Sequence, residues 1–583
     1  MRKHKTIRII SFIIVASFFA SCKSEPTKFE LASPIQQISL KRVENMPNLP
    51  KPFKIIDFKS LAKGYDSLVF DKTQTGEYWP LIWEDNSRKN FDQETFGIYT
   101  AMGDLRQGPE HYNGIFHESL ASIGSVFGAS LVGIDKSDQN GANYVSMLKN
   151  YFNSDTKWNI VMNNTSPEVA LLGGGYARDW WYDVYPNVLF YGVANFYPNE
   201  KDYTQIMRSV ADKFYKADSV MAGNYAHSFF DYATLEPKDN WICKQQDAAA
   251  GHAYVLYAAY QKFQDPKYLK GAKSSLEALL AQPKNEFYEI LMPFGAYVAA
   301  RLNAEEGTNY DYTKILEWTF NGTPECRKGW GVLQDNWNGY DVSGLVGSTV
   351  DHGGFAFLMN TYDTMWPLVP MVRYDQRYAN VIGKWMLNAS NALKFFYPYE
   401  MPDDHQTIPE LKQFTKGVIA YEGLIKESHF DKYKDIKAPV AIGDGPHWVE
   451  GNPDVSQFSV YGSGHVGIAG AIISKTNVEN ILQLDLLATD FYRGDAFSTY
   501  LYYNPNPEIK EVIISVGENE FKIYDAIQRA FIAMNVKNKF TFKVDKEQAA
   551  LLIMVPQAAV ISEKNGKLYA NDIVIDYRYS AVN

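Results

Sequence analysis

Two aspartates, Asp179 and Asp183, stand four residues apart in the aromatic stretch GGGYARDWWYDVYPN at residues 173–187. On a helix they project from one face, roughly 6 Å apart along the axis. Two carboxyl groups so placed can divide general acid and general base work. A structural role competes with this one: Asp179 caps the helix and Asp183 pairs with Arg178. We expect at least one of the two aspartates to lie in a pocket.

A second candidate is DHGGF at residues 351–355, where Asp351 and His352 stand in a glycine-rich turn ahead of an apolar segment. This pattern places two titratable groups at the start of a helix. Asp351 alone is explained by helix capping, but a cap has no need of His352. We therefore expect catalytic roles for both.

A third acid stands beside aromatic and glycine residues in GDGPHWVEGNPD, residues 443–454. Glu450, His447 and Trp448 have the composition of a sugar subsite, in which a tryptophan supports the ring next to an acid. A solvated loop is the plainer alternative. In KQQDAAAGHAYV, residues 244–255, Asp247 opens a helix, and His252 is more typical of packing than of catalysis.

Aromatic residues make up 15% of the chain. Their flat faces complement the C–H faces of pyranose rings, although a large aromatic core needs them equally. The expected substrate-binding residues are Trp83, Arg178, Trp180, Trp181, Tyr182, Trp337, His447 and Trp448.

The sequence predicts neither a metal site nor a cofactor. His111 and His117 are six residues apart, and neither HExxH nor a calcium-binding loop pattern is present. The glycines of YGSGHVGIAG, residues 461–470, precede a helix without a preceding strand or a GK[ST] motif, which argues against a nucleotide loop. No GxSxG motif for a serine hydrolase occurs.

The elements that must position these residues are mainly helices, because apolar residues recur at helical spacing from about residue 115 onwards. Short polar turns join many of them into hairpins at irregular intervals, which favours a closed helical toroid over a regular solenoid. We predict helices over 115–131, 142–152, 177–196, 203–221, 245–263, 267–281, 286–303, 311–320, 354–372, 376–396, 408–425 and 465–488.

After residue 498 the pattern changes to alternating β-branched segments, and Asn565-Gly566 is a hairpin signal. We expect a small C-terminal β-sandwich over 498–583, after an (α/α) toroid over 76–497. The proline-containing stretch 22–75 is predicted to be a tether and an extended entry segment.

Residues 1–21 have the basic start and the apolar run of a secretory signal, too short for a stable transmembrane helix. Phe19-Ala20-Ser21-Cys22 resembles a bacterial lipobox, so Cys22 is the expected lipid anchor in the cell envelope. Two further cysteines, Cys243 and Cys326, are too few for a disulfide scaffold, and the sequence leaves their pairing open.

Removal of residues 1–21 takes away four basic side chains and leaves 53 Lys and Arg against 67 Asp and Glu, a net charge of −14. Nucleic acid is therefore an unsuitable partner. The sequence does not indicate an oligomeric state.

The lipobox, the helical-hairpin region and the C-terminal β segments that include LLIMVPQ and YANDIVIDYR together resemble exported Bacteroidota lipoproteins of glycan breakdown. The helical region resembles the six-hairpin, or (α/α)6 toroid, glycosidases. This resemblance implies a carbohydrate substrate and leaves the reaction open, because hydrolases and polysaccharide lyases share the toroid.

Three functions remain. A glycoside hydrolase would use a carboxylate pair drawn from Asp179, Asp183, Asp351 and Glu450. A lyase would use a base such as His352, His252 or Tyr254, with Arg178 or Arg373 to neutralise a uronate. A glycan-binding lipoprotein without catalysis would use the aromatic residues alone.

Overall fold

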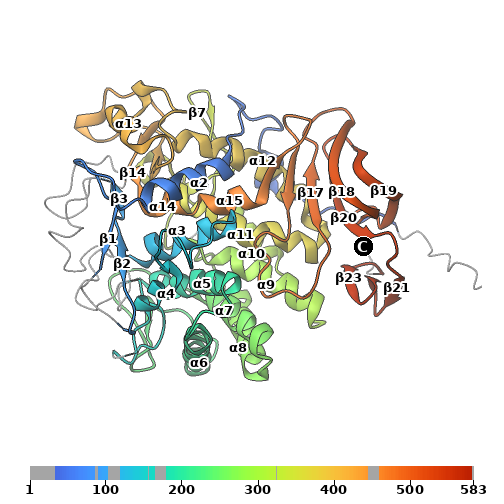
Figure 1. The fold of residues 1–583 in the computed structure, drawn as a ribbon, viewed down its shortest axis with the longest axis horizontal. Helices are drawn as coiled ribbons and strands as arrows, with labels where there is room; N and C mark the ends of the chain where they lie inside the picture. The colour runs from blue at the N-terminus through green and yellow to red at the C-terminus, as the bar shows by residue number, and fades with distance from the viewer. Residues whose placement is uncertain are drawn as a thin grey trace, which may run out of the picture.

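The computed structural model of the chain describes residues 33–580 except 86–89, 103–117, 155, 164–178, 323–324 and 444–457, and leaves the side chain of His352 undescribed. Within these residues the chain forms helices over most of its length and strands towards the C-terminus (Figure 1). Among the described helices, none combines the length and the apolar character that a membrane span requires.

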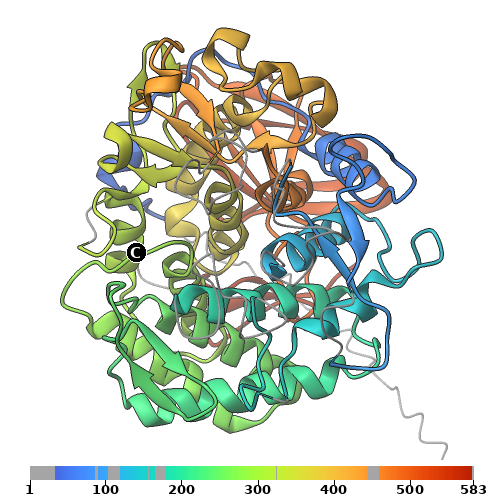
Figure 2. The same ribbon diagram turned by 90° about the vertical axis from the view of Figure 1, so that its left-hand side faces the viewer.

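Six helices form a ring of successive contacts, in which α15 closes back on α3. The colour in Figure 2 passes round this ring in chain order. The apolar character of these helices extends round the whole circumference, and in α11 every residue is buried, which is typical of helices surrounded by protein. The ring consists of α3 (Ser119–Leu131), α5 (Trp180–Phe196), α7 (Ala248–Phe263), α9 (Met292–Glu305), α11 (Leu358–Tyr374) and α15 (Val466–Ile472).

A second layer of helices covers the ring from outside. These helices are amphipathic: in α2, for example, Phe58, Ala62 and Tyr65 are buried at helical spacing while Lys59 and Lys63 are exposed. The outer helix α8 contacts both α7 and α9, and α12 contacts α11. The outer layer contains α2 (Phe58–Val69), α6 (Tyr203–Met221), α8 (Pro266–Ala281), α10 (Thr313–Asn321) and α12 (Ala379–Ala392), with the short α4 (Tyr144–Met147) between α3 and α5.

The ring closes through a glycine contact. A Cβ atom at Gly467 of α15 would lie 2.0 Å from the carbonyl oxygen of Gly128 in α3, and one at Gly128 would lie 2.0 Å from the oxygen of Gly464. Only glycine at these positions lets the first and last ring helices approach this closely.

Two predicted helices are wrong. Residues 408–425 form a short turn of helix, α13 (Lys412–Thr415), and then β11 (Ala420–Tyr421) and β12 (Gly423–Ile425), because Lys416 and Gly417 take left-handed backbone angles that end the helix. The helix predicted over 465–488 ends at Ile472, and a strand hairpin with alternating burial follows it.

The C-terminal part is a six-stranded antiparallel sheet in the order β15-β16-β17-β20-β18-β19, followed by a three-stranded sheet. Leu501, Leu551 and Ile553 on one face join the core of the helical part. Tyr502 and Leu552, which alternate with them, face a second apolar cluster. The strands are β15 (Ile473–Lys475), β16 (Leu482–Asp485), β17 (Thr499–Tyr503), β18 (Lys510–Asp525), β19 (Ala530–Val544), β20 (Ala549–Pro556), β21 (Ile561–Lys564), β22 (Lys567–Ala570) and β23 (Ile573–Asp576).

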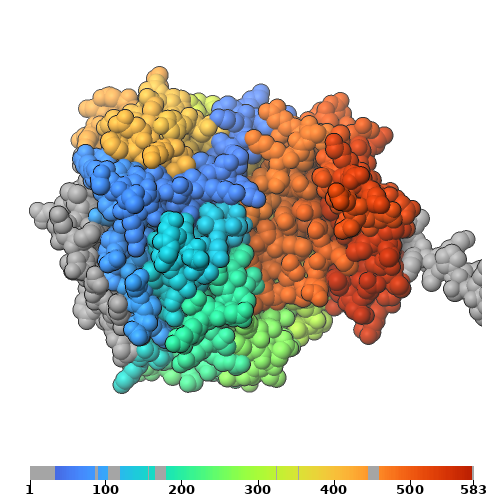
Figure 3. All heavy atoms as spheres, in the orientation of Figure 1, coloured from blue at the N-terminus to red at the C-terminus, as the bar shows by residue number. Residues whose placement is uncertain are grey.

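The sheet lies at one end of the helical part, as the orange and red atoms of Figure 3 show. Arg301, in the last turns of α9, donates to the carbonyl oxygens of Phe491 and Tyr492 at 3.0 and 3.2 Å. These two residues lie in the segment between β16 and β17. The C-terminal ends of ring helices therefore bind the sheet.

Small sheets occupy the opposite end, where β10 (Phe355–Phe357) leads directly into α11. It is the central strand of a five-stranded sheet in the order β13-β12-β10-β9-β6, with β6 (Trp330–Val332), β9 (Val346–Ser348) and β13 (Val440–Ile442). A second sheet pairs β14 (Phe458–Ser459) with β11 and with β3 (Ala101–Met102). The connection between residues 330 and 354, which precedes a helix predicted from residue 354, thus contains strands that fix the start of α11.

Candidate functional site

Asp179 occupies the N-cap position of α5 and is only 7% exposed. Gln245 donates its side-chain amide to Asp179 Oδ1 and accepts the backbone N–H of Trp181 at 3.0 Å. The pKa of Asp179 is raised to about 7, mainly by burial and to a smaller extent by the nearby charge of Glu289, while Gln245, Tyr288 and Arg327 act in the opposite direction. The carboxyl group can therefore carry a proton near neutral pH.

Glu289 lies three residues before Met292, the first residue of α9. Its carboxylate binds partners from two other parts of the chain. Arg327 donates Nη1 to one carboxylate oxygen. Asn360, in the first turn of α11, donates Nδ2 to the other at 2.9 Å. The guanidinium group stacks over the Trp330 ring, 3.7 Å from its centroid. These donors favour the charged form of Glu289.

A third carboxyl group lies beneath these two. Asp247 occupies the N-cap of α7, has no exposed surface, and accepts the backbone N–H of Tyr288 at 3.1 Å. Burial raises its pKa to about 8, with smaller contributions from Glu289 and Glu286. A largely protonated Asp247 thus supports the segment that carries Tyr288 and Glu289.

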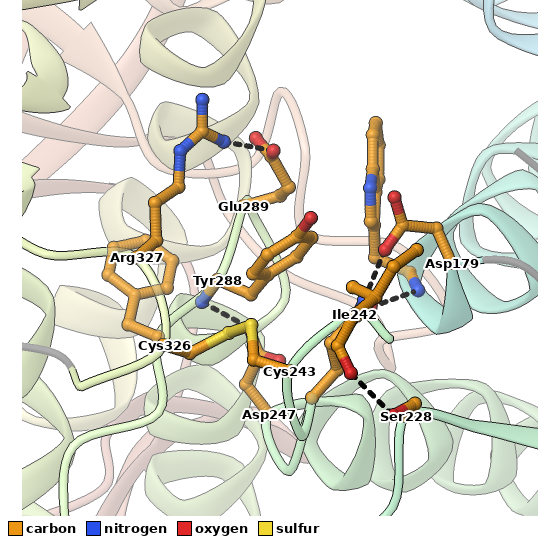
Figure 4. Close-up of a disulfide and its surroundings, with 12 residues drawn as sticks. Asp179, Ser228, Ile242, Cys243, Asp247, Tyr288, Glu289, Cys326 and Arg327 are labelled. Carbon is orange, nitrogen blue, oxygen red and sulfur yellow. Dashed lines mark hydrogen bonds and ion pairs between the residues drawn. A yellow bond between two sulfur atoms is a disulfide. The ribbon is translucent and has the colours of Figure 1, made fainter. Parts of the chain in front are cut away.

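The starts of α5, α7, α9 and α11 therefore meet in one place, which we call the acidic mouth and define by Asp179, Asp247, Glu289 and Asn360. Figure 4 shows the side chain of Glu289 between those of Arg327 on the left and Asp179 on the right, with the ring of Tyr288 below it. Burial raises the pKa of Tyr288 far above its ordinary value, and the nearby charges of Asp179 and Glu289 act in the same direction. An acid that holds its proton and a charged carboxylate with a guanidinium partner can together perform acid and base chemistry on one bound molecule.

A disulfide joins Cys243 and Cys326 beside this mouth, with their Cα atoms 5.6 Å apart. It answers the question of pairing that the sequence leaves open. Both cysteines are half-buried.

The other predicted catalytic residues have different positions. Asp183, one turn into α5, has no exposed surface. Asp351 lies 3.9 Å from Arg327 Nε, with its side chain 43% exposed, and so lies next to the mouth. The side chain of His352 and the whole of Glu450 lie outside the described residues.

Of the predicted binding residues, Trp180 packs in the core, where its ring stacks on Tyr225 and its Nε1 donates to the Tyr232 hydroxyl at 3.1 Å. The rings of Trp181 and Tyr182 contact each other at 3.9 Å between centroids, and Tyr182 is half-buried.

Trp83 and Trp337 are 6% and 1% exposed. Trp337 donates Nε1 to Asp335 at 2.9 Å and covers Gly354, which makes it a support for the turn before α11. Arg178, His447, Trp448 and Cys22 lie outside the described residues.

His252 has a structural environment. It has no exposed surface, contacts the hydroxyl of Tyr232 at 2.7 Å, and stacks on Phe214. Burial lowers its pKa to about 3.

A further buried acid, Glu422, accepts the hydroxyl of Tyr461 at the start of α14 (Val460–Gly464), and its carbonyl oxygen accepts Leu358 N at 3.0 Å. It therefore lies at the start of α11, on the same end of the ring as the acidic mouth. Sequence reasoning missed both Glu422 and Glu289. In the part of the chain that the structure describes, no three His, Cys, Asp or Glu side chains are grouped as metal ligands.

No family model matches the chain, and no curated protein matches its sequence. Similar solved structures include a family 127 β-L-arabinofuranosidase from Geobacillus stearothermophilus, with 10% identity, a TM-score of 0.32, and coverage of 88% of this chain and 80% of that one. A second family 127 β-arabinofuranosidase has 10% identity, a TM-score of 0.38, and coverage of 94% and 86%.

A family 76 glycoside hydrolase from a bovine Bacteroides thetaiotaomicron strain has 11% identity, a TM-score of 0.38, and coverage of 71% of this chain and 77% of that one. These neighbours bear glycosidase names. At such low scores the likeness assigns no residue and no reaction to this chain.

Proposed function

We propose that the protein is a glycoside hydrolase in which Asp179 is the general acid and Glu289 is the second carboxylate. The observation that carries the proposal is the contrast between the two groups. Burial keeps a proton on Asp179 up to about pH 7, while Glu289 accepts hydrogen bonds from the Arg327 guanidinium and the Asn360 amide. Environments that separate the protonation of two neighbouring carboxyl groups are what glycosidic cleavage requires.

In this mechanism Asp179 gives its proton to the glycosidic oxygen as the bond from the anomeric carbon to that oxygen breaks. Glu289 either takes a proton from the attacking water or attacks the anomeric carbon itself. Arg327 orients Glu289 through a charge-assisted hydrogen bond. Gln245 orients Asp179 from the other side.

The alternative, a lyase acting on a uronate-containing glycan, needs a base and a cation for the uronate carboxylate. His252 has no exposed surface, and Tyr254 is 4% exposed. Arg327 already binds Glu289 and lies near Asp351. The described residues therefore favour hydrolysis.

The same proposal covers the domains of the chain, its substrate and its location. The contact ring and its outer layer are the (α/α)6 toroid of a catalytic domain, which includes α2 and so begins before the boundary at residue 76 expected from the sequence. The strands from β15 onwards form an accessory β-sandwich, which therefore begins before residue 498. The substrate is an oligosaccharide or polysaccharide fragment that meets an enzyme anchored in the cell envelope through Cys22.

The proposal is tested by incubating the protein with a panel of neutral and uronate-containing oligosaccharides while following both reducing ends and the ultraviolet absorbance of unsaturated uronates. We expect new reducing ends without absorbance. Growth of absorbance would establish the lyase instead, and binding without either signal would establish a glycan-binding protein.

On the substrate so found, Asp179→Asn and Glu289→Gln are each expected to lower kcat roughly a hundred- to ten-thousand-fold. Asp138→Asn and Glu317→Gln make the same chemical changes at exposed positions and should leave kcat unchanged. The wild-type kcat/KM should decline as the pH rises through about 7, because Asp179 then loses its proton. A residual rate in Asp179→Asn close to that of the wild type would exclude it as the acid.

A further inference from the structure

The Cys243–Cys326 disulfide joins the two chain segments that carry the partners of the proposed carboxylate pair. Cys243 is two residues before Gln245, which donates to Asp179. Cys326 directly precedes Arg327, which donates to Glu289. One covalent bond thus lies between the residue that orients the acid and the residue that orients the second carboxylate (Figure 4).

The segment around Cys243 is held by hydrogen bonds to an earlier segment of the chain. Ser228 Oγ donates to the carbonyl oxygen of Ile242 at 2.7 Å, and Gln245 N donates to the carbonyl oxygen of His227 at 2.9 Å. Trp241 between them is 82% exposed, which shows that the loop projects into solvent. The disulfide adds a covalent restraint to these hydrogen bonds, two residues before Gln245.

The segment around Cys326 has a similar character. Glu325 N donates to the Asn285 carbonyl oxygen at 3.1 Å, and Trp330 N donates to that of Arg327 at 3.0 Å. Among the described strands, β6 begins only at Trp330, and no strand pairing joins this segment to the one around Cys243. The disulfide is therefore a direct link between two segments that are 83 residues apart in the chain.

We propose that the Cys243–Cys326 disulfide is a positioning device for catalysis, which holds Gln245 against Asp179 and Arg327 against Glu289 at the same time. This inference rests on the proposed function. A dithiol reductant that passes two electrons and two protons to the bond gives two thiols and the oxidised cyclic dithiol. The reduced enzyme keeps its fold and loses catalytic rate.

The test uses the folded protein, reduced with dithiothreitol and alkylated with iodoacetamide, with mass spectrometry to show two blocked thiols. The control is the same protein alkylated without reduction. We expect kcat to fall at least tenfold with a smaller change in KM. The Cys243→Ala/Cys326→Ala variant should behave in the same way, which excludes an effect of the alkyl groups.

Two further readouts separate positioning from general stabilisation. The high-pH limb of the kcat/KM profile should move to higher pH, because Gln245 and Arg327 both lower the pKa of Asp179 and both are loosened. Hydrogen exchange should accelerate in residues 239–247 and 325–330 and stay unchanged in α8.

Three results would overturn the proposal. The first is full alkylation with kcat retained. The second is a high-pH limb of the kcat/KM profile that stays in place or moves to lower pH, and the third is hydrogen exchange that accelerates throughout α7, α8 and α9. The last would show that the bond holds the fold and not two side chains. If the oxidised protein cleaves no glycoside at all, the proposed function fails, while the exchange data still decide whether the bond restrains the two segments.

Discussion

Two aspartates show at the residue scale how burial overrides a favourable helix dipole. Asp179 and Asp247 both occupy N-cap positions of ring helices. The partial positive charge of a helix N-terminus stabilises a nearby carboxylate by about 1 kcal/mol or less, which lowers its pKa. The rise of the Asp179 pKa from 3.8 to about 7 corresponds to roughly 4 kcal/mol in the opposite direction. Loss of water around these carboxyl groups therefore decides their protonation.

The same argument predicts that Asp247→Asn stabilises the protein at alkaline pH. Asp247 binds its proton in the folded state up to about pH 8, whereas in the unfolded chain it releases the proton near pH 4. The folded state binds more protons between these values, so its stability falls as the pH rises through this window. Asparagine keeps the acceptor for Tyr288 N and removes the charge.

We therefore expect the melting temperature of Asp247→Asn to exceed that of the wild type at pH 8, with a smaller difference at pH 5. Asp265→Asn is the matched control, because Asp265 caps the outer helix α8 with hydrogen bonds that lower its pKa. Its substitution should destabilise slightly at pH 8. A melting temperature of Asp247→Asn that falls relative to wild type as the pH rises would contradict this account.

The sequence revealed the acids that stand beside a helix start and missed those whose partners are distant. Asp179 could be found because a glycine turn, a carboxyl group and a helix pattern follow one another locally. Glu289 has its partners 38 and 71 residues further along the chain, at Arg327 and Asn360, so nothing near it in the sequence marks it as an ion-pair partner. Trp180 shows the opposite error, because a tryptophan in an apolar helix is more often core than platform.

At the scale of elements, helices with long, steady periodicity were predictable, and those that depend on backbone angles were not. The helix predicted over 203–221 is confirmed as α6, and those over 245–263 and 267–281 differ from α7 and α8 by at most three residues. The helix α2 was missed although Phe58, Ala62 and Tyr65 have helical spacing, because proline residues nearby indicated a tether. The region 408–425 failed at Lys416 and Gly417, whose left-handed angles a hydrophobic pattern does not record.

The junction between the ring and the sheet depends on Arg301. Its guanidinium is buried and binds the carbonyl oxygens of Phe491 and Tyr492 as well as the Glu305 carboxylate, whose Oε2 lies 3.0 Å from Nε. We predict that Arg301→Met destabilises the protein by roughly 3 to 5 kcal/mol, because it removes a buried cation from the half-buried Glu305 carboxylate and from two carbonyl oxygens.

Differential scanning calorimetry measures this loss, and limited proteolysis shows whether cleavage concentrates near residues 486–498. Arg208→Met on the outer helix α6, where the exposed guanidinium lies over the ring of Phe263, 4.0 Å from its centroid, is the matched control. A melting temperature equal to that of the control would show that the sheet is held by its apolar face alone.

At the scale of the whole molecule, the predicted lipid anchor is tested through Cys22. We expect Cys22→Ser to abolish incorporation of radiolabelled palmitate and to release the protein from the membrane fraction of cells, because one lipid-modified cysteine supplies the apolar chains that bind a bilayer. Cys243→Ser, which removes a different cysteine, should leave labelling intact. Equal labelling of Cys22→Ser and the wild type would exclude the anchor.

One end of the ring holds the proposed catalytic residues and the other end binds the C-terminal sheet. This separation affects how substrate specificity can change without loss of stability. The residues of the acidic mouth lie at or just before the first turns of ring helices, whereas Arg301 and Glu305 lie in the last turns of α9, with Arg301 roughly 14 Å along the helix from its first residue. Substitutions more than about 10 Å apart without shared partners have nearly additive effects on stability. Random mutagenesis of residues 239–242 and 331–350, which leaves Gln245, Arg327 and the disulfide in place, can therefore explore new substrates while the contacts of Arg301 with the sheet segment stay unchanged. This end of the ring is the natural starting point for selecting altered specificity.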